Sequence, residues 1–81
     1  MSFDYVVKDP EGIHARPAGV IVKAAKEIGG DIKITKGAKT VAAKQLFGLM
    51  SLGVKSGETI TVSSDDEAAL EAFKKVIEEN I

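Results

Sequence analysis

Three short segments alternate apolar and polar residues, and this alternation constrains the fold more than any other feature of the chain. The segments are residues 2–7, 31–35 and 59–63. A period of two predicts β-strands that are apolar on one face and polar on the other. A fourth strand is expected at residues 40–43, after a turn at residues 36–39. One-sided strands favour an antiparallel or mixed sheet that helices cover on one face only.

The first predicted helix is bounded by a proline and a pair of glycines. It is expected to begin between Ala15 and Pro17 and to end near Ile28, just before Gly29 and Gly30. Proline in the first helical turn loses no needed N–H, and glycine tolerates the left-handed conformation that ends many helices. The apolar residues of this segment share one helical face. They are Ala18, Ile21, Val22, Ala25 and Ile28.

Two further helices complete the predicted order. A short helix is expected at Gln45–Leu52, with Gly53 as its stop. Ser64–Glu67 resembles a capping box, which predicts the start of the last helix. The buried stripe of that helix consists of Leu70, Phe73, Val76 and Ile77. The order is therefore βαββαβα, an α+β fold. Residues 1–81 are expected to form a single domain, because a chain of this length suits one hydrophobic core.

The composition excludes several classes of function. The chain has no cysteine and one histidine, so we expect neither a disulfide framework nor a metal site. The net charge of -1 argues against nucleic-acid binding, which needs many contacts that neutralise phosphates. No apolar run reaches the roughly 20 residues that cross a membrane, and the first residues lack the basic and apolar regions expected of a signal peptide. We therefore expect a cytoplasmic protein without direct membrane insertion.

The segment Gly12–Gly19, with the sequence GIHARPAG, carries the candidate chemistry. Pro17 sets the helix start close behind His14, so His14 is expected just before the helix or at its N-cap. The first N–H groups of a helix have no intrahelical partner, and the helix dipole places partial positive charge there. That end of the helix suits an anion. Arg16 adds a cation whose planar donor fork suits phosphate.

His14 is therefore a candidate nucleophile. Nearby positive charge disfavours the imidazolium, and the neutral imidazole is the nucleophilic form. The same donors suit the oxygens of a phosphoryl group once it is attached to the ring. The alternative interpretation is a histidine that merely precedes a helix, next to an arginine that extends into solvent.

Two motifs give the sequence its resemblance to HPr, the histidine-containing phosphocarrier family of the bacterial sugar phosphotransferase system. Residues 12–18 read GIHARPA, which resembles the active-site motif of the family. Residues 44–54 read KQLFGLMSLGV, which resembles its second helix. The spacing and the element order agree as well, so the resemblance covers essentially the whole chain. It implies an open-faced β-sandwich, in which three helices cover one face of a four-stranded antiparallel sheet.

The resemblance also implies a function. Enzyme I, charged by phosphoenolpyruvate, is expected to phosphorylate His14 on Nδ1, and the IIA domain of a sugar transporter then receives the group. Such a chain is a monomeric phosphocarrier without a cofactor of its own, rather than a stand-alone enzyme. Arg16 is the implied catalytic support of His14. The implied phosphoryl-binding residues are His14, Ala15, Arg16, Pro17 and Ala18.

One position departs from the family pattern. Many HPr proteins of Gram-positive bacteria have a serine that a regulatory kinase phosphorylates, and this chain has Gln45 there, which carries no hydroxyl. We therefore do not expect control by that kinase. The paralogue Crh shows the opposite pattern, with the serine but without the histidine. The alternative function is a regulatory protein-binding module that signals through the phosphorylation state of His14.

Partner docking is expected on the second helix and on the first helix near Val20. The second helix has too many apolar residues for one side of a short helix, and an exposed apolar patch usually marks a partner surface. We expect Phe47 and Met50 to be partly exposed. Nearby positive charge suits acidic partner rims. The predicted docking residues are Val20, Lys23, Lys44, Leu46, Phe47, Leu49 and Met50.

Overall fold

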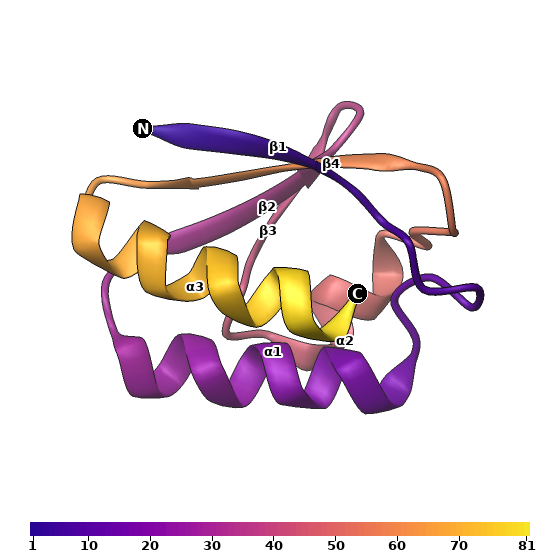
Figure 1. The fold of residues 1–81 in the computed structure, drawn as a ribbon, viewed down its shortest axis with the longest axis horizontal. Coiled ribbons are helices and arrows are strands. Elements are labelled where there is room, and N and C mark those ends of the chain that lie inside the picture. The colour runs from indigo at the N-terminus through magenta and orange to yellow at the C-terminus, as the bar shows by residue number, and fades with distance from the viewer.

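The computed structural model describes all of residues 1–81, and its elements follow the predicted order βαββαβα (Figure 1). The strands are β1 (Ser2–Val6), β2 (Ile32–Lys36), β3 (Lys39–Ala42) and β4 (Thr59–Ser64). The helices are α1 (Ala15–Ile28), α2 (Leu46–Ser51) and α3 (Glu67–Asn80). None of the three helices has the length and apolar character that a membrane crossing needs.

The strands form one antiparallel sheet in the order β1-β4-β2-β3. Val62 of β4 lies opposite Phe3 of β1 and Ile34 of β2. Ile34 in turn lies opposite Val41 of β3, so one apolar row crosses the whole sheet. All three helices lie on one face of this sheet (Figure 1). The predicted open-faced sandwich is confirmed.

The hydrophobic core lies between the sheet and the helices. Ile34 from the sheet, Ile21 from α1 and Phe73 from α3 are all fully buried. Burying a side chain of this kind stabilises a fold by about 1.5–3 kcal/mol. On the opposite face, the hydroxyl of Thr61 donates a hydrogen bond to Asp4 Oδ1 at 2.8 Å. The sheet therefore keeps one polar face, as the alternation predicts.

The last helix begins later than the capping-box pattern predicts. Its N-cap is Asp66 rather than Ser64, and Asp66 Oδ1 accepts a hydrogen bond from the N–H of Ala69 at 3.1 Å. Ser64 belongs to β4, because it pairs with Ile32 at the end of the sheet. Its hydroxyl oxygen accepts a hydrogen bond from the N–H of Asp66 at 3.1 Å. Ser64 therefore belongs to the sheet, and Asp66 caps the helix instead.

Smaller differences affect the other boundaries. β3 begins at Lys39 because Gly37 and Ala38 alone make the turn after β2, a shorter turn than the sequence predicts. Gly37 has φ +61°, which suits the first central position of a two-residue hairpin. α2 begins one residue later and ends one residue earlier than the predicted 45–52. Val76 is half-buried rather than part of the fully buried stripe of α3.

Candidate functional site

His14 lies at the N-cap of α1, as the position of Pro17 predicts. Its backbone is extended, with φ -104° and ψ -174°, and its side chain makes no capping hydrogen bond. The imidazole is 30% exposed. Because the ring is not used to cap the helix and reaches the surface, it is accessible to a reaction partner.

The backbone ahead of His14 is held against the loop that follows α2. The N–H of Ile13 donates to the carbonyl oxygen of Val54 at 3.0 Å. Gly12 has φ +69°, and a Cβ at this position would lie 2.2 Å from the same Val54 oxygen. Only glycine fits so close to another backbone at this φ. The position of His14 therefore depends on a contact with a segment about forty residues away in the chain.

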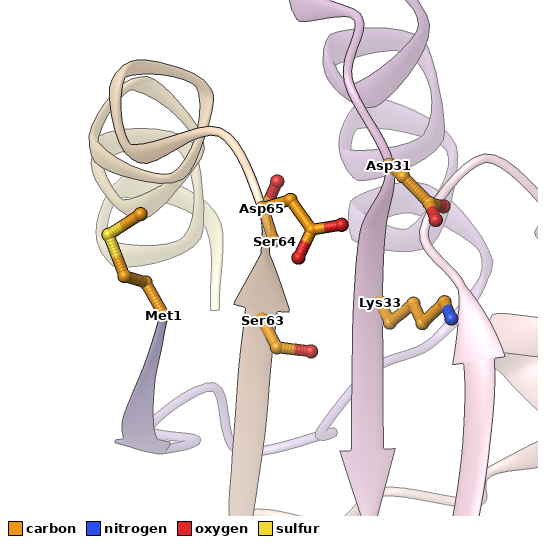
Figure 2. Close-up of a pocket in the computed structure, with 6 residues that line it drawn as sticks. All are labelled: Met1, Asp31, Lys33, Ser63, Ser64 and Asp65. Carbon is orange, nitrogen blue, oxygen red and sulfur yellow. The ribbon is translucent and has the colours of Figure 1, made fainter.

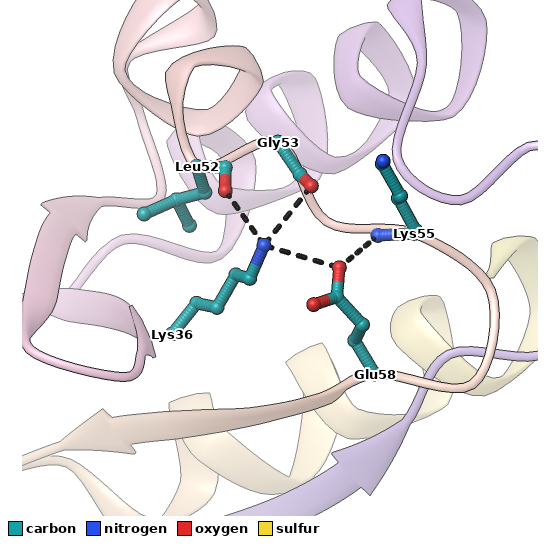
Figure 3. Close-up of polar contacts among 5 residues, drawn as sticks. All are labelled: Lys36, Leu52, Gly53, Lys55 and Glu58. Atoms are coloured by element: carbon teal, nitrogen blue, oxygen red, sulfur yellow. Dashed lines mark hydrogen bonds and ion pairs between the residues drawn. The ribbon is translucent and has the colours of Figure 1, made fainter.

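Figure 3 shows the polar cluster that holds this second segment in place. Lys36 Nζ donates to the carbonyl oxygens of Leu52 at 3.2 Å and Gly53 at 3.1 Å, just beyond α2. It also forms an ion pair with Glu58 Oε1 at 3.0 Å. The same carboxylate oxygen accepts a hydrogen bond from the N–H of Lys55 at 2.6 Å. This hydrogen bond, helped by Lys36, lowers the pKa of Glu58 below its ordinary value. The cluster thus braces the loop against which His14 is positioned.

The start of α1 offers fewer N–H groups than the predicted set implies. The N–H of Ala18 donates to the carbonyl oxygen of His14 at 3.0 Å, so the helix itself uses it. Pro17 has no N–H and is buried. The groups that have no partner within the helix are those of Ala15 and Arg16. Two adjacent backbone donors therefore remain beside His14 for an anion.

The side chain of Arg16 borders an open hollow of about 360 Å³ beside the start of α1. Asp9, Pro17 and Val20 contribute to the same hollow, which the end of α3 closes with Glu79 and Asn80. Arg16 is exposed and forms no ion pair within the chain. Its guanidinium is therefore available to a bound anion next to the free amides.

Two carboxylates approach the imidazole from the turn that precedes it, and neither is among the site residues predicted from the sequence. Asp9 Oδ1 lies 3.8 Å from His14 Nε2, and Glu11 Oε2 lies 3.7 Å from the same nitrogen. The sequence-based expectation includes only the positive charge around His14. The sequence nevertheless contains a signal for these contacts. Acidic residues stand three and five positions before the histidine, in a predicted turn that could bring them near the ring.

The predicted docking residues divide between the surface and the core. Phe47 is 85% exposed, and Leu46 and Met50 of the same helix are exposed as well. We call these three residues the apolar face of α2. Leu49 is fully buried, so its prediction as a docking residue is wrong: the side of α2 that carries it contributes to the core. Val20, at 42% exposure, lies on α1, which contacts α2.

The polar members of the predicted surface are all exposed. Lys23 lies on α1, and Lys44 directly precedes Gln45, the N-cap of α2. Gln45 makes no side-chain capping hydrogen bond. The structure therefore presents lysines on both elements that carry the exposed apolar residues.

A second small hollow, of about 140 Å³, lies beside the start of β2 and the end of β4 (Figure 2). Lys33 and Ser63 line it from neighbouring strands, together with Asp31 and Asp65. Asp31 follows the end of α1, and a helix of 14 residues is about 21 Å long. This hollow is therefore separate from the site around His14. Nowhere in the chain do three or more histidine, aspartate or glutamate side chains form a cluster that could hold a metal ion.

Comparison with known proteins gives full-length similarities. A protein-family model described as "PTS HPr component phosphorylation site" matches residues 1–79. The phosphocarrier protein HPr of Mycoplasma pneumoniae is 40% identical over 79 residues, which cover 93% of this chain and 90% of the relative.

Solved structures agree with these sequence matches. The phosphocarrier protein HPr from Bacillus anthracis has a TM-score of 0.88 at 33% identity, and the match covers 100% of this chain and 96% of that one. A histidine-containing phosphocarrier protein of Mycoplasma has a TM-score of 0.90 at 29% identity, with 98% and 93% covered. Sequence and fold are thus similar to these proteins over nearly their whole length.

Proposed function

Because this chain belongs to the HPr family, the phosphocarriers of the phosphotransferase system, we propose that His14 is the residue that carries its phosphoryl group. As a family member, the chain is a phosphotransfer component rather than a stand-alone enzyme. The observation that carries the proposal is the accessible imidazole at the N-cap of α1, beside two backbone N–H groups that have no partner in the helix. His14 is also the only histidine in the chain.

The proposed transfer uses a lone pair of the imidazole. That pair attacks phosphorus on the charged enzyme I, and the bond between phosphorus and the donor breaks as the new N–P bond forms. The N–H groups of Ala15 and Arg16 bind the phosphoryl oxygens, and the Arg16 guanidinium adds a bidentate donor. Each hydrogen bond to a charged group of this kind contributes about 1.5–3 kcal/mol. Binding of this size holds the group and still permits its release to the next acceptor.

The partners that the family implies are enzyme I and the IIA domains of sugar transporters. We propose that both dock on the apolar face of α2 and on the exposed part of α1 around Val20 and Lys23. The exposure of Phe47 supports this, because large exposed apolar groups mark interaction surfaces. Lys23, Lys44 and Arg16 supply the positive charge that an acidic partner rim would meet. One surface shared by donor and acceptor lets the two bind in turn.

We further propose that the chain is a single-domain monomer and that it encounters enzyme I and the IIA domains in the cytoplasm. Light scattering on the purified protein measures its mass in solution. A dimer at working concentrations, stable after dilution, would contradict the monomer.

A phosphotransfer assay tests the central proposal. Incubation with enzyme I and phosphoenolpyruvate is expected to add one acid-labile phosphate per chain, and His14→Ala is expected to abolish it. Thr61→Ala, on the polar face of the sheet, is the matched control and should accept phosphate at the original rate. Normal phosphate uptake by His14→Ala would refute the assignment. Onward transfer to a IIA domain then separates a carrier from a purely regulatory module.

A further inference from the structure

We propose that Asp9 and Glu11 are positioning residues for phosphoryl transfer. Their carboxylates keep the proton of His14 on Nε2, which leaves Nδ1 as the attacking atom, and they offset the positive charge that the ring gains when it is phosphorylated. This inference rests on the proposed function, in which His14 is the acceptor.

Both carboxylates approach the same nitrogen of the imidazole. The distances from Nε2 are 3.8 Å to Asp9 Oδ1 and 3.7 Å to Glu11 Oε2. A neutral imidazole has one N–H and one lone pair, and an ionised carboxylate can only accept hydrogen bonds. Two negative charges within 4 Å of Nε2 therefore favour, electrostatically, the tautomer that carries the proton on that nitrogen. The lone pair is then on Nδ1.

The Asp9 carboxylate is built into the turn. Its Oδ1 accepts a hydrogen bond from the N–H of Glu11 at 2.9 Å, and the Asp9 carbonyl oxygen accepts one from Gly12 at 2.9 Å. The Asp9 N–H donates to the carbonyl oxygen of Ile81 at 2.9 Å. Its side chain is 21% exposed, whereas that of Glu11 is 74% exposed. Asp9 is therefore the more constrained of the two, and we expect the larger effect from it.

The charge balance of the transfer explains why these carboxylates matter. When the Nδ1 lone pair forms the bond to phosphorus and the donor leaves, the ring keeps its Nε2 proton and gains one positive charge. The nearby carboxylates stabilise that charge. When the N–P bond breaks during onward transfer, the electron pair returns to Nδ1 and the ring is neutral again. The proton stays on Nε2 throughout, so no proton acceptor is needed.

No carboxylate other than those of Asp9 and Glu11 forms an ion pair with the ring. Arg16 on α1 follows His14 by two residues and borders the neighbouring hollow. Glu79 on α3 borders the same hollow together with Asp9. Within 4 Å of the imidazole, Asp9 and Glu11 are the acidic partners. They are therefore the groups to change.

The decisive variant is Asp9→Asn, because an asparagine side-chain oxygen can still accept the hydrogen bond from Glu11 and only the charge is removed. Glu11→Gln and the double variant complete the series, and Glu71→Gln, on the exposed side of α3, controls for net charge. We expect the double variant to accept phosphate about five- to tenfold more slowly. A rate change of this size is what the loss of two partly exposed ion pairs would produce. Nitrogen NMR of the imidazole should show the Nε2–H tautomer decline.

The outcomes separate this inference from the proposed function. If the unchanged protein takes up no phosphate, the proposed function fails. If it takes up phosphate normally and the double variant keeps the original tautomer and the original rate, only the role of the carboxylates is refuted. A purely structural role predicts that Asp9→Asn behaves like the original protein while Asp9→Ala is slow, so this pattern also overturns the inference.

Discussion

Replacing Gly12 with alanine tests whether the contact between the His14 loop and the loop after α2 positions the site. A left-handed φ costs a residue other than glycine about 1–2 kcal/mol. The added Cβ would also lie 2.2 Å from Val54 O and 2.8 Å from Lys55 Cα, both of them backbone atoms. One of the two loops must therefore move, which adds about 1–3 kcal/mol of overpacking. The hydrogen bond from Ile13 to Val54, worth about 0.5–1.5 kcal/mol, is then weakened or lost.

Gly37→Ala is the matched control for this variant. Gly37 has a similar φ of +61°, but a Cβ added there would meet no atom within 4 Å, so only the backbone strain is introduced. Urea unfolding is expected to show that Gly12→Ala loses about 2–4 kcal/mol more free energy of unfolding than Gly37→Ala. At a temperature where Gly12→Ala is folded, its rate of phosphate uptake should fall by up to about a hundredfold. Displacing a reacting group such as His14 by about 1 Å can slow a reaction by this factor. Equal destabilisation of the two variants, with normal uptake by both, would falsify the positioning argument.

Three other predictions follow from the helices and the loop cluster. Phe47→Ala should raise the KM for enzyme I and change the free energy of unfolding by no more than about 0.5 kcal/mol. Leu49→Ala should lower the free energy of unfolding, measured in urea, by about 2–5 kcal/mol. The reverse pattern would contradict the assigned faces of α2. Asp66→Ala removes the cap of α3 and should cost about 0.5–2 kcal/mol in thermal unfolding, and an unchanged melting temperature would count against Asp66 as the cap. The pKa of Glu58 is lowered from its ordinary value of 4.5 by the Lys55 N–H and by Lys36. Its contribution to stability is therefore present above that value and is lost as the pH falls through the lower folded pKa. Glu58→Gln should flatten the acid side of the stability profile, and an identical profile would refute the role of the cluster.

Local patterns in the sequence were sufficient to predict the order of the elements and the location of the helix start at His14. Strand alternation, Pro17 and the Gly29-Gly30 pair each act within a few residues, so their effect does not depend on the rest of the fold. The two motifs then indicated the family, which the full-length matches confirm. The boundary errors at β3 and α3 have a common cause. Several residues there could end a strand or cap a helix, and pairing across the sheet selected among them.

Only the tertiary structure decided which apolar residues of α2 face the core and which carboxylates face the imidazole. α2 is six residues long, so its sequence is compatible with several buried faces, and packing against the rest of the core places Leu49 inside and Phe47 outside. Asp9 and Glu11 reach His14 because the turn folds back before the helix begins. Such contacts depend on how a loop is held against distant backbone, here Gly12 against Val54. The sequence identifies the residues that react. How the neighbouring side chains are oriented around them is fixed only when separate segments pack together.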